Sequence, residues 1–375
     1  MTLLYDFECD YRPADQVFDI GVDERRGCWA RIVRTGVIYG NPQWAIYDSV
    51  PGDEIQVTIG ECRGVHPYDD GGQIVSQTVH ITHSLTLHGG FSRDFSGSGR
   101  PAEYPDPDAT TFDAQGLGRT VFVPGGVTIT MSRFILVKGD AAGLGGGPGD
   151  AGGGFYYAGA SGLLQQIDFY SNTADYGGAF YNAGDELNML DSWINLNTAS
   201  ADGGGVYNAS GTITITAVSV GPDRNNSSQV YSNTAGSRGG GIYNAGGRLV
   251  FLHNNVVLDQ GDLGGLNSLN RADQGGFLYN DTGWVYLENN SIFSNNAQDG
   301  GAIYNSSGTL TLEGNAIYAN SVINGGSGEG GGIFSGGGAL ILDGGNELYD
   351  NAADGYGGAI HVTGVLTAWN TVLYD

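Results

Sequence analysis

Lysine is almost missing from this chain. Lys138 is the only one, whereas aspartate and glutamate together number 40 and the formal net charge is −25. A surface this acidic repels the phosphates of nucleic acids and of anionic lipids. We therefore expect neither nucleic acid nor an anionic membrane surface as a partner.

Long apolar runs are missing too. The sequence contains no stretch of about 20 apolar residues, the length that a membrane-spanning helix needs. Its first ten residues, MTLLYDFECD, lack the basic flank and the apolar core of a secretory signal peptide. We expect neither a membrane-spanning helix nor a signal peptide in these residues.

Cysteine is scarce, and its three copies (Cys9, Cys28 and Cys62) all lie near the N-terminus. No Cys-x-x-Cys pair and no Cys/His spacing indicates a metal site. In an exported protein Cys28 and Cys62 could form a disulfide that pins the N-terminal segment and leaves Cys9 unpaired. Three separate thiols are the alternative, and the residues leave both open.

Sustained 3.6-residue apolar spacing is missing as well, whereas apolar and polar residues often alternate, as they do in β-strands. The most prominent feature that is present is a six-residue phrase, here called the glycine phrase, which recurs eight times. Its copies are GGGFYY (Gly152–Tyr157), GGAFYN (Gly177–Asn182), GGGVYN (Gly203–Asn208), GGGIYN (Gly239–Asn244), GGFLYN (Gly275–Asn280), GGAIYN (Gly300–Asn305), GGGIFS (Gly330–Ser335) and GGAIHV (Gly357–Val362).

Consecutive glycine phrases begin about 25 to 36 residues apart, a period typical of stacked repeats. Each unit also holds two further strand-like runs, such as Thr309–Leu312 and Ile317–Asn320. Three short strands cannot bury their own apolar face, so neighbouring units must stack. The sequence therefore predicts an all-β fold, a single-stranded parallel β-helix with three short strands per coil of about 25 residues.

The predicted β-helix covers residues 46–375, with its regular repeats over residues 152–375. Residues 1–45 are acidic and do not repeat. Unpaired strand edges recruit other chains unless they are covered. We expect residues 1–45 to form an N-terminal cap over the open end.

Two groups of motifs resemble known families. Glycine phrases such as Gly300–Asn305, with an intervening Phe/Ile-x-x-Asn such as Phe169–Asn172, resemble the repeats of chlamydial polymorphic outer-membrane proteins. The runs Pro51–Val57, Leu85–Phe91 and Thr111–Gly116 are similar to segments of bacterial secreted right-handed parallel β-helix proteins of the pectin-lyase-like fold. The resemblance implies a right-handed helix and a place outside the cell or on a bacterial cell surface.

That fold hosts lyases, hydrolases, adhesins and tailspikes alike, so the resemblance does not select an activity. Export implies a leader, which this sequence does not contain. We expect that a leader has been removed or that the chain is part of a longer one.

The fifth position of the glycine phrase forms an aromatic column. The residue before it is always apolar and should point into the core, so the column should point to solvent. In-register rings can bind sugar rings or a partner protein, or can stack on one another and stabilise the sheet, which is the commoner role. The candidate binding residues are Tyr181, Tyr207, Tyr243, Tyr279, Tyr304 and Phe334.

Asparagine dominates the sixth position, and it also ends the third strand of most units. Buried amides in stacked sheets need one another as hydrogen-bond partners. Both sets therefore predict axial ladders of side-chain amides. The first set is Asn182, Asn208, Asn244, Asn280 and Asn305; the second is Asn172, Asn197, Asn233, Asn295, Asn320 and Asn351.

Acidic residues precede most of the glycine phrases. Carboxylates on successive coils would lie close enough to repel one another, and hydration or Ca²⁺ bridging would relieve this repulsion. We favour the interpretation that these carboxylates lie in solvated turns, and we expect no required cofactor. Ca²⁺ is the one candidate cation for these carboxylates. The candidate ligands are Asp175, Asp202, Asp273, Asp299, Glu329 and Asp354.

Two insertions, Gln260–Gln274 and Ser321–Glu329, interrupt the regular spacing. Both are predicted to leave the same corner, between the third strand of one coil and the first of the next. Loops on a rigid scaffold often carry function. Together they could flank a groove that holds Asp259, Asp262, Arg271, Asp273 and Asp299.

Catalytic residues are not evident. A polyuronate lyase needs a cation and a base, and the residues that come nearest to this set are Arg119, Arg133, Lys138, His80 and His88. The two histidines are expected to face outward. The Asn-Thr-Asp and Gly-His-Gly motifs of polygalacturonases and pectate lyases do not occur.

Two functions follow from these residues. The first is a secreted or surface-displayed adhesion or structural module that binds a glycan or a surface protein. The alternative is a Ca²⁺-assisted polysaccharide lyase, or a glycoside hydrolase, of the same fold.

Overall fold

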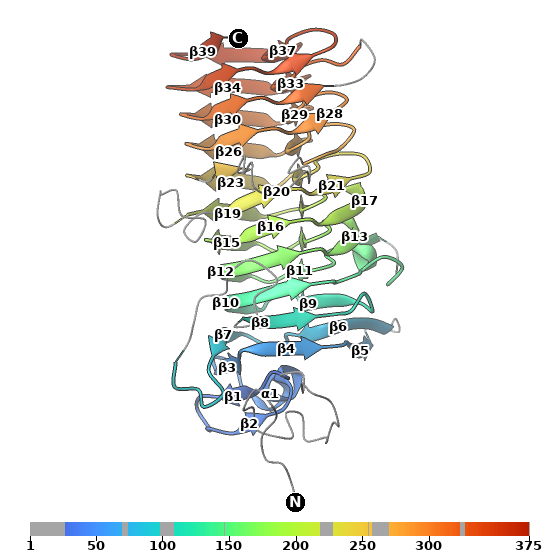
Figure 1. The fold of residues 1–375 in the computed structure, drawn as a ribbon, viewed down its shortest axis with the longest axis vertical. Helices are drawn as coiled ribbons and strands as arrows, with labels where there is room; N and C mark the ends of the chain where they lie inside the picture. The colour runs from blue at the N-terminus through green and yellow to red at the C-terminus, as the bar shows by residue number, and fades with distance from the viewer. Residues whose placement is uncertain are drawn as a thin grey trace, which may run out of the picture.

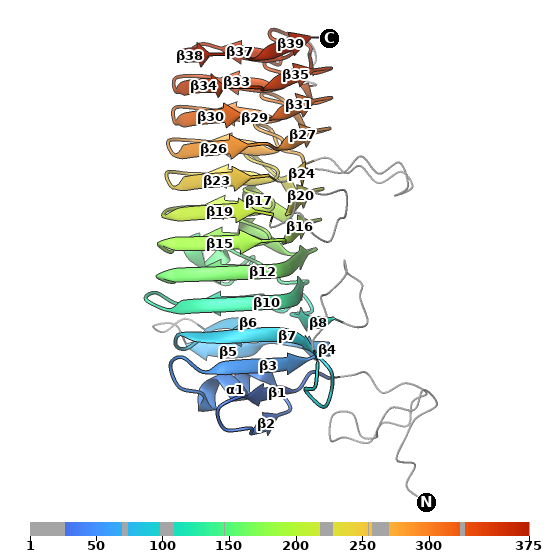
Figure 2. The same ribbon diagram turned by 90° about the vertical axis from the view of Figure 1, so that its left-hand side faces the viewer.

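The computed structural model describes residues 27–69, 74–97, 109–145, 147–217, 228–253, 255–256, 270–322 and 327–374. Their regular structure is nearly all β, with one short α-helix and one 3₁₀ turn (Gly147–Asp150). Figures 1 and 2 show the strands stacked in layers along one long axis. Among the helical segments that the structure describes, none has the length and apolarity needed to cross a membrane. The long parallel sheets are compatible with a parallel β-helix.

The eight glycine phrases supply eight strands of one continuous 11-stranded sheet, here called the phrase sheet, and three strands earlier in the chain supply the rest. Consecutive phrases pair parallel and in register, so Tyr181 lies opposite Tyr207 and Asn182 opposite Asn208. In spatial order its strands are β5 (His66–Asp69), β6 (Ile74–His80), β9 (Arg119–Val123), β11 (Phe155–Tyr157), β14 (Phe180–Asn182), β18 (Val206–Asn208), β22 (Ile242–Asn244), β25 (Leu278–Asn280), β29 (Ile303–Asn305), β33 (Ile333–Ser335) and β37 (Ile360–Val362).

A larger sheet of 17 strands, here called the long sheet, follows the chain around a corner of each layer. The ten-residue strand β10 shows this, because its first part pairs with β7 and its second with β8. The strands of the long sheet are β1 (Ala30–Ile32), β2 (Ile38–Tyr39), β3 (Glu54–Thr58), β4 (Gly60–Arg63), β7 (Leu85–Phe91), β8 (Thr110–Asp113), β10 (Thr128–Val137), β12 (Ser161–Tyr170), β15 (Glu186–Leu190), β16 (Trp193–Asn195), β19 (Thr212–Thr216), β20 (Gln229–Tyr231), β23 (Arg248–Leu252), β26 (Trp284–Glu288), β30 (Thr309–Glu313), β34 (Ala339–Asp343) and β38 (Val365–Ala368).

Three short parallel sheets complete the layers. The first comprises β24 (Asn255–Val256), β27 (Ser291–Phe293), β31 (Ala316–Tyr318), β35 (Glu347–Tyr349) and β39 (Val372–Tyr374). The second comprises β13 (Thr173–Tyr176), β17 (Thr198–Asp202) and β21 (Thr234–Ala235). The third comprises β28 (Asn296–Ala297), β32 (Ser321–Val322) and β36 (Ala352–Ala353).

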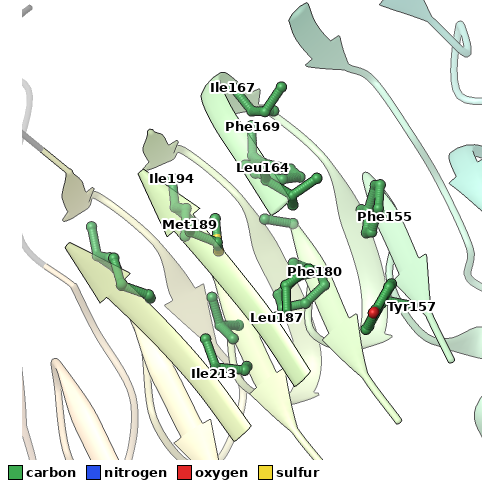
Figure 3. Close-up of a cluster of buried hydrophobic side chains, with 14 of the residues drawn as sticks. Phe155, Tyr157, Leu164, Ile167, Phe169, Phe180, Leu187, Met189, Ile194 and Ile213 are labelled. Atoms are coloured by element: carbon green, nitrogen blue, oxygen red, sulfur yellow. The ribbon is translucent and has the colours of Figure 1, made fainter. Parts of the chain in front are cut away.

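The core runs through the layers because strand alternation sends every second side chain inward. Phe155, Phe180 and Leu187 are completely buried, and Figure 3 shows Phe180 of the phrase sheet beside Leu187 of the long sheet. Each fully buried side chain of this size contributes about 1.5–3 kcal/mol. One cluster of buried residues extends from the N-terminal cap to the last layers.

A cap closes the N-terminal end. Helix α1 (Pro42–Asp48) begins at Asn41, whose side chain accepts the Gln43 backbone N–H at 2.7 Å. The helix buries Ala45 and Ile46, and β1 pairs antiparallel with β3. The predicted cap boundary at residue 45 falls inside this helix, and residues 1–26 lie outside the described residues.

A disulfide joins Cys28 to Cys62, with their Cα atoms 5.1 Å apart. It ties the start of the cap to β4, which belongs to the first layers of the long sheet. The sequence left open whether these cysteines form a disulfide or stay separate thiols, and the structure has the disulfide. Cys9 lies outside the described residues.

Both predicted asparagine ladders are present. In the first, each Nδ2 donates to the Oδ1 of the next layer from Asn182 as far as Asn305, at 2.8–2.9 Å, and Asn305 donates to Ser335 at 3.1 Å. In the second, Asn270 stands between Asn233 and Asn295 and closes a gap that the sequence pattern left. These amides satisfy one another inside the core.

Candidate functional site

The aromatic column is a continuous ladder of rings along the outer face of the phrase sheet. From Phe122 to His361, neighbouring ring centroids lie 4.6–5.4 Å apart with interplanar angles of 9–26°. His80 and Tyr68 extend the ladder toward the cap through edge-to-face contacts, with interplanar angles of 70° and 69°. Its members are Tyr68, His80, Phe122, Tyr156, Tyr181, Tyr207, Tyr243, Tyr279, Tyr304, Phe334 and His361.

Stacking decides what this aromatic ladder can offer a ligand. Each ring face is covered by the next ring, so only the ring edges and the phenol hydroxyls point away from the sheet. Tyr181, Tyr207, Tyr304 and Phe334 are half-buried. Tyr243 and Tyr279 are only 3% and 6% exposed, so the prediction that the whole column faces solvent was wrong for these two.

Arg238 is the reason that the middle of the ladder is covered. Its guanidinium lies 4.7 Å from the ring centroid of Tyr243 and 5.3 Å from that of Tyr279. Two hydrogen bonds of 2.9 and 2.7 Å fix it to the buried carboxylate of Asp202. This arrangement combines cation–π attraction with a bidentate ion pair.

Arg119 covers the first part of the ladder in the same way. It lies 5.5 Å from the ring centroid of Phe122 and 5.2 Å from that of Tyr156. Its Nη2 donates to the carbonyls of Gly149 and Ala151 at 2.8 and 3.0 Å. Arg119 is 1% exposed, so it is not an accessible cation for a substrate.

Burial also raises the pKa values of tyrosines in the ladder. It is the largest cause that raises the pKa of Tyr181 to about 12, with smaller contributions from neighbouring phenols. The pKa values of Tyr207 and Tyr304 are raised as well, again mainly by burial. The half-buried hydroxyls of the ladder therefore remain protonated hydrogen-bond donors at neutral pH.

The predicted acidic column does not exist as one column. Asp202, Asp299 and Glu329 come directly before a glycine phrase, whereas Asp175 and Asp273 stand one residue earlier. Asp354 stands a further residue away from its phrase. Asp202 is in register with Arg238, and Arg238 with Gln274, so an ion pair replaces the expected repulsion.

Most of these carboxylates have neighbours other than a second carboxylate. Ser200 donates to Asp175, and Gln298 donates to Asp273 at 2.6 Å. In the part of the chain that the structure describes, no three His, Cys, Asp or Glu side chains are arranged to hold a metal ion. The Ca²⁺ interpretation stays a prediction.

Asp299 and Glu329 are the exception, because they occupy the same position on consecutive layers. Burial raises the pKa of Asp299, and the charge of Glu329 adds to that shift. Glu329 donates its backbone N–H to Asp299 at 3.2 Å. Its carboxylate lies 3.6 Å from Nε2 of His361.

The two insertions do not leave the same corner. Val256 pairs with Ile292 and Asn270 is a ladder residue, so the first insertion lies before the ladder asparagine of its layer. The second follows β32, after the ladder asparagine. The predicted shared corner was therefore wrong.

The residues of the predicted groove are only partly described. Asp259 and Asp262 lie outside the described residues. Arg271 is exposed, and it bridges Thr234 and Asn296 through its backbone. Asp273 and Asp299 follow on the same edge of adjacent layers, so these three share a surface without forming a described groove.

The predicted catalytic candidates fall into two groups on different sheets. His80 is buried between the rings of Tyr68 and Phe122, so the expectation that it faces solvent was wrong. His88 belongs to the long sheet, where its Nδ1 contacts Ser132 Oγ at 2.5 Å and burial lowers its pKa.

Lys138 directly follows β10 of the long sheet and pairs with Asp113 of β8 at 3.1 Å. Arg133 lies near His88, where its charge contributes to the lowered histidine pKa. The structure therefore separates His80 and Arg119 from the other three candidates.

This surface offers a regular spacing of ring edges and phenol hydroxyls. It can donate and accept hydrogen bonds along a straight row, which suits binding more than bond cleavage. Comparisons with protein-family models, with curated proteins and with solved structures found no match.

Proposed function

We propose that this chain is a right-handed parallel β-helix that works outside the cell or on a bacterial cell surface as an adhesion or structural module. The in-register parallel strands and the resemblance to secreted β-helix proteins support this architecture. The Cys28–Cys62 disulfide supports an exported protein, because such bonds persist in oxidising compartments.

The aromatic ladder is the single observation that carries the proposal. It gives one face of the molecule a regular row of stacked rings, in which the half-buried Tyr181, Tyr207 and Tyr304 carry hydroxyls. A ligand that runs parallel to the axis can accept a hydrogen bond from several of them. Because ring faces are covered, binding would use edges and hydroxyls, on a neutral glycan or a surface protein.

The net charge further restricts the class of glycan that can bind. At −25 the chain repels polyuronates unless a cation intervenes. The burial of Arg119 and His80 removes two of the residues on which the lyase alternative depended. Adhesion therefore fits the described geometry better than polyuronate cleavage.

A binding panel with a conservative triple variant tests this function. Tyr181→Phe, Tyr207→Phe and Tyr304→Phe together keep the stacked rings and remove three exposed hydroxyls. We expect binding to one of immobilised cellulose, chitin, xylan or mucin to fall at least about threefold in the triple variant, about the worth of one net hydrogen bond. The matched control is Tyr318→Phe, Tyr349→Phe and Tyr374→Phe on the separate stack formed by β31, β35 and β39.

Equal losses in both triple variants, or no binding to any member of the panel, would count against an adhesive ladder. The same polysaccharides and polygalacturonate, incubated with and without Ca²⁺, test the alternative. Release of unsaturated uronides by the chain would overturn the adhesion proposal in favour of a lyase.

A further inference from the structure

Two aromatic residues on the long sheet differ from those of the ladder. Trp284 and Tyr286 stand on the outer face of β26, where Val285 and Leu287 between and beside them are fully buried. Their ring centroids lie 5.9 Å apart with an interplanar angle of 14°. Both are half-buried, and together they form a surface here called the aromatic shelf.

Only one side of the aromatic shelf is covered. On the preceding layer Arg248 is in register with Trp284, and its guanidinium lies 4.5 Å from a Trp284 ring centroid. On the following layer Thr309 and Thr311 are in register with the two aromatic residues. Threonine is too short to cover an aromatic ring, so Thr309 and Thr311 leave part of the ring faces toward β30 uncovered, which agrees with the half-buried state of both rings.

A row of carboxylates borders the accessible side. Glu288, Glu313 and Asp343 are in register on β26, β30 and β34. The Tyr286 hydroxyl donates to Glu313 at 2.6 Å and to Glu288 at 3.1 Å. Like charges in register repel, so a cation beside this row would be stabilised.

The basic groups nearby do not neutralise the whole row. His253 lies 3.8 Å from Glu288, and Arg248 occupies the opposite side of Trp284. Within the described residues no ion pair joins Glu313 or Asp343 to a basic side chain. Both carboxylates are exposed.

Another part of the chain shows which chemical group binds over aromatic rings beside a carboxylate. On the phrase sheet, Arg238 lies over two tyrosine rings and is held by the carboxylate of Asp202. The aromatic shelf has the same two components, ring faces and a neighbouring carboxylate, and among the described residues the cation over its rings is Arg248, on the side away from β30. A guanidinium over a ring and beside a carboxylate gains from both interactions.

We propose that the aromatic shelf is a docking site for an arginine side chain of a basic partner segment. The guanidinium lies over Trp284 and Tyr286 on the side of β30 and donates to Glu313 and Asp343. The net charge of −25 draws such a segment toward the molecule and speeds its encounter. This site lies on another sheet than the aromatic ladder and does not depend on the ladder's function.

Titration of the full chain with a fluorescent oligo-arginine peptide at physiological ionic strength tests the site. Trp284→Ala should raise Kd about 2- to 5-fold, the range of an exposed cation–π contact. Glu313→Gln should raise Kd by a similar factor, and Trp284→Phe, which keeps a ring, should lose less. Urea unfolding of each variant verifies that the fold is retained.

Two control variants separate the site from general charge attraction. Trp44→Ala removes an exposed tryptophan on α1, and Asp354→Asn removes an exposed carboxylate away from the shelf. Neither should change Kd. If Asp354→Asn weakens binding as much as Glu313→Gln, the peptide binds the acidic surface as a whole and the docking site is refuted. Tight binding of chitosan oligomers at the shelf without binding of the peptide would replace the proposal by an amino-sugar site.

Discussion

Asparagine side chains join successive layers inside the stack by hydrogen bonds, as backbone amides join the strands of its sheets. Asn244 is completely buried, accepts from Asn208 at 2.8 Å and donates to Asn280 at 2.9 Å. All the bonds of this ladder point the same way along the axis, an arrangement in which each bond polarises the next. A single missing amide therefore leaves a donor and an acceptor unsatisfied on two sides.

The first prediction concerns Asn244→Ala. Removing its amide leaves Asn208 and Asn280 without one partner each, and each unsatisfied buried group costs about 1–3 kcal/mol. We expect the free energy of unfolding to fall by about 2–5 kcal/mol, measured by urea denaturation. Asn188→Ala is the control, because its half-buried amide lies outside the ladders and donates to Glu186 at 3.2 Å. A loss of equal size in both variants would contradict the role of the ladder.

A second prediction concerns Arg238→Met. The substitution leaves the carboxylate of Asp202 buried without its cation, and breaking such a pair costs about 3–5 kcal/mol. The double variant Asp202→Asn with Arg238→Met should recover part of the lost unfolding free energy, because no charge is then buried. A double variant that is less stable than Arg238→Met by the full cost of a second defect would exclude coupling between the two residues.

The carboxyl of Asp299 provides a pH-dependent prediction. Because burial and the charge of Glu329 raise its pKa above the ordinary value of 3.8, the folded chain holds this proton more tightly than the unfolded chain does. Its contribution to stability is therefore present at low pH and is lost as the pH rises through the folded pKa. Asp299→Asn removes this loss.

We expect the Asn variant to be more stable than the parent by about 0.2–1 kcal/mol at neutral pH, and to equal it near pH 3. Urea unfolding at both pH values measures the difference. A difference that is the same at both pH values would show that the ionisation of Asp299 does not contribute.

At the scale of elements, the glycine phrase shows why so much of the fold follows from the residues. Gly177 has a φ of 62°, and a Cβ there would lie 2.2 Å from the carbonyl oxygen of Phe180. A side chain at this position would have to move backbone atoms, so glycine is required at the corner. Position by position, the phrase thus predicts the corner, the inward residue, the outward ring and the amide ladder.

Other features had no repeating signal. Helix α1 is only seven residues long, although Asn41 followed by Pro42 is a typical helix start. Asn270 was missed because an insertion displaces it from the repeat spacing. The covering of Tyr243 and Tyr279 depends on Arg238, a residue that occurs at its position in one layer alone among the glycine phrases.

The third sheet position also escaped prediction. In register with Trp284 and Tyr286, the neighbouring strands carry Arg248 and Val250 on one side and Thr309 and Thr311 on the other, so no column of rings pointed to them. Their importance depends on what lies in register on the layers before and after. Which residues lie beside Trp284 and Tyr286 depends on the register in which the strands pair. The spacing of the glycine phrases gives this register only after the layers have been aligned.

The aromatic ladder as an element predicts alkaline sensitivity. A phenol whose pKa is raised to about 12 in the folded state, as for Tyr181, opposes ionisation there, whereas the unfolded chain ionises near its ordinary value of 10.0. Stability should therefore fall as the pH rises above about 10, and Tyr181→Phe should reduce this fall. Urea midpoints between about pH 9 and pH 11 measure the effect.

The control for this experiment is Tyr356→Phe, since Tyr356 is 72% exposed. Its substitution should leave the alkaline slope unchanged. Parallel slopes for the parent and Tyr181→Phe would mean that burial of this phenol does not couple to folding.

At the scale of the whole molecule, each layer contacts mainly its two neighbours, so stability need not be uniform along the axis. The described part of the N-terminal cap, from residue 27 onward, has no asparagine ladder like that of the later layers. Its covalent tie is the Cys28–Cys62 disulfide, which spans a sequence separation of 34. The two ends of the described stack thus depend on different interactions.

Reduction of this disulfide gives the last prediction. A cross-link over a loop of this size contributes about 3–4 kcal/mol in the loop-entropy description, so Cys28→Ser with Cys62→Ser should lower the unfolding free energy by about that amount. Hydrogen exchange should show the loss first in β1, β3 and α1, while β22, β25 and β29 stay protected. Treating the parent with a reductant should reproduce the pattern, and treating the double variant should add nothing. A uniform loss of protection from the cap to β29 would instead mean that all layers unfold as one unit, with the disulfide stabilising the stack as a whole.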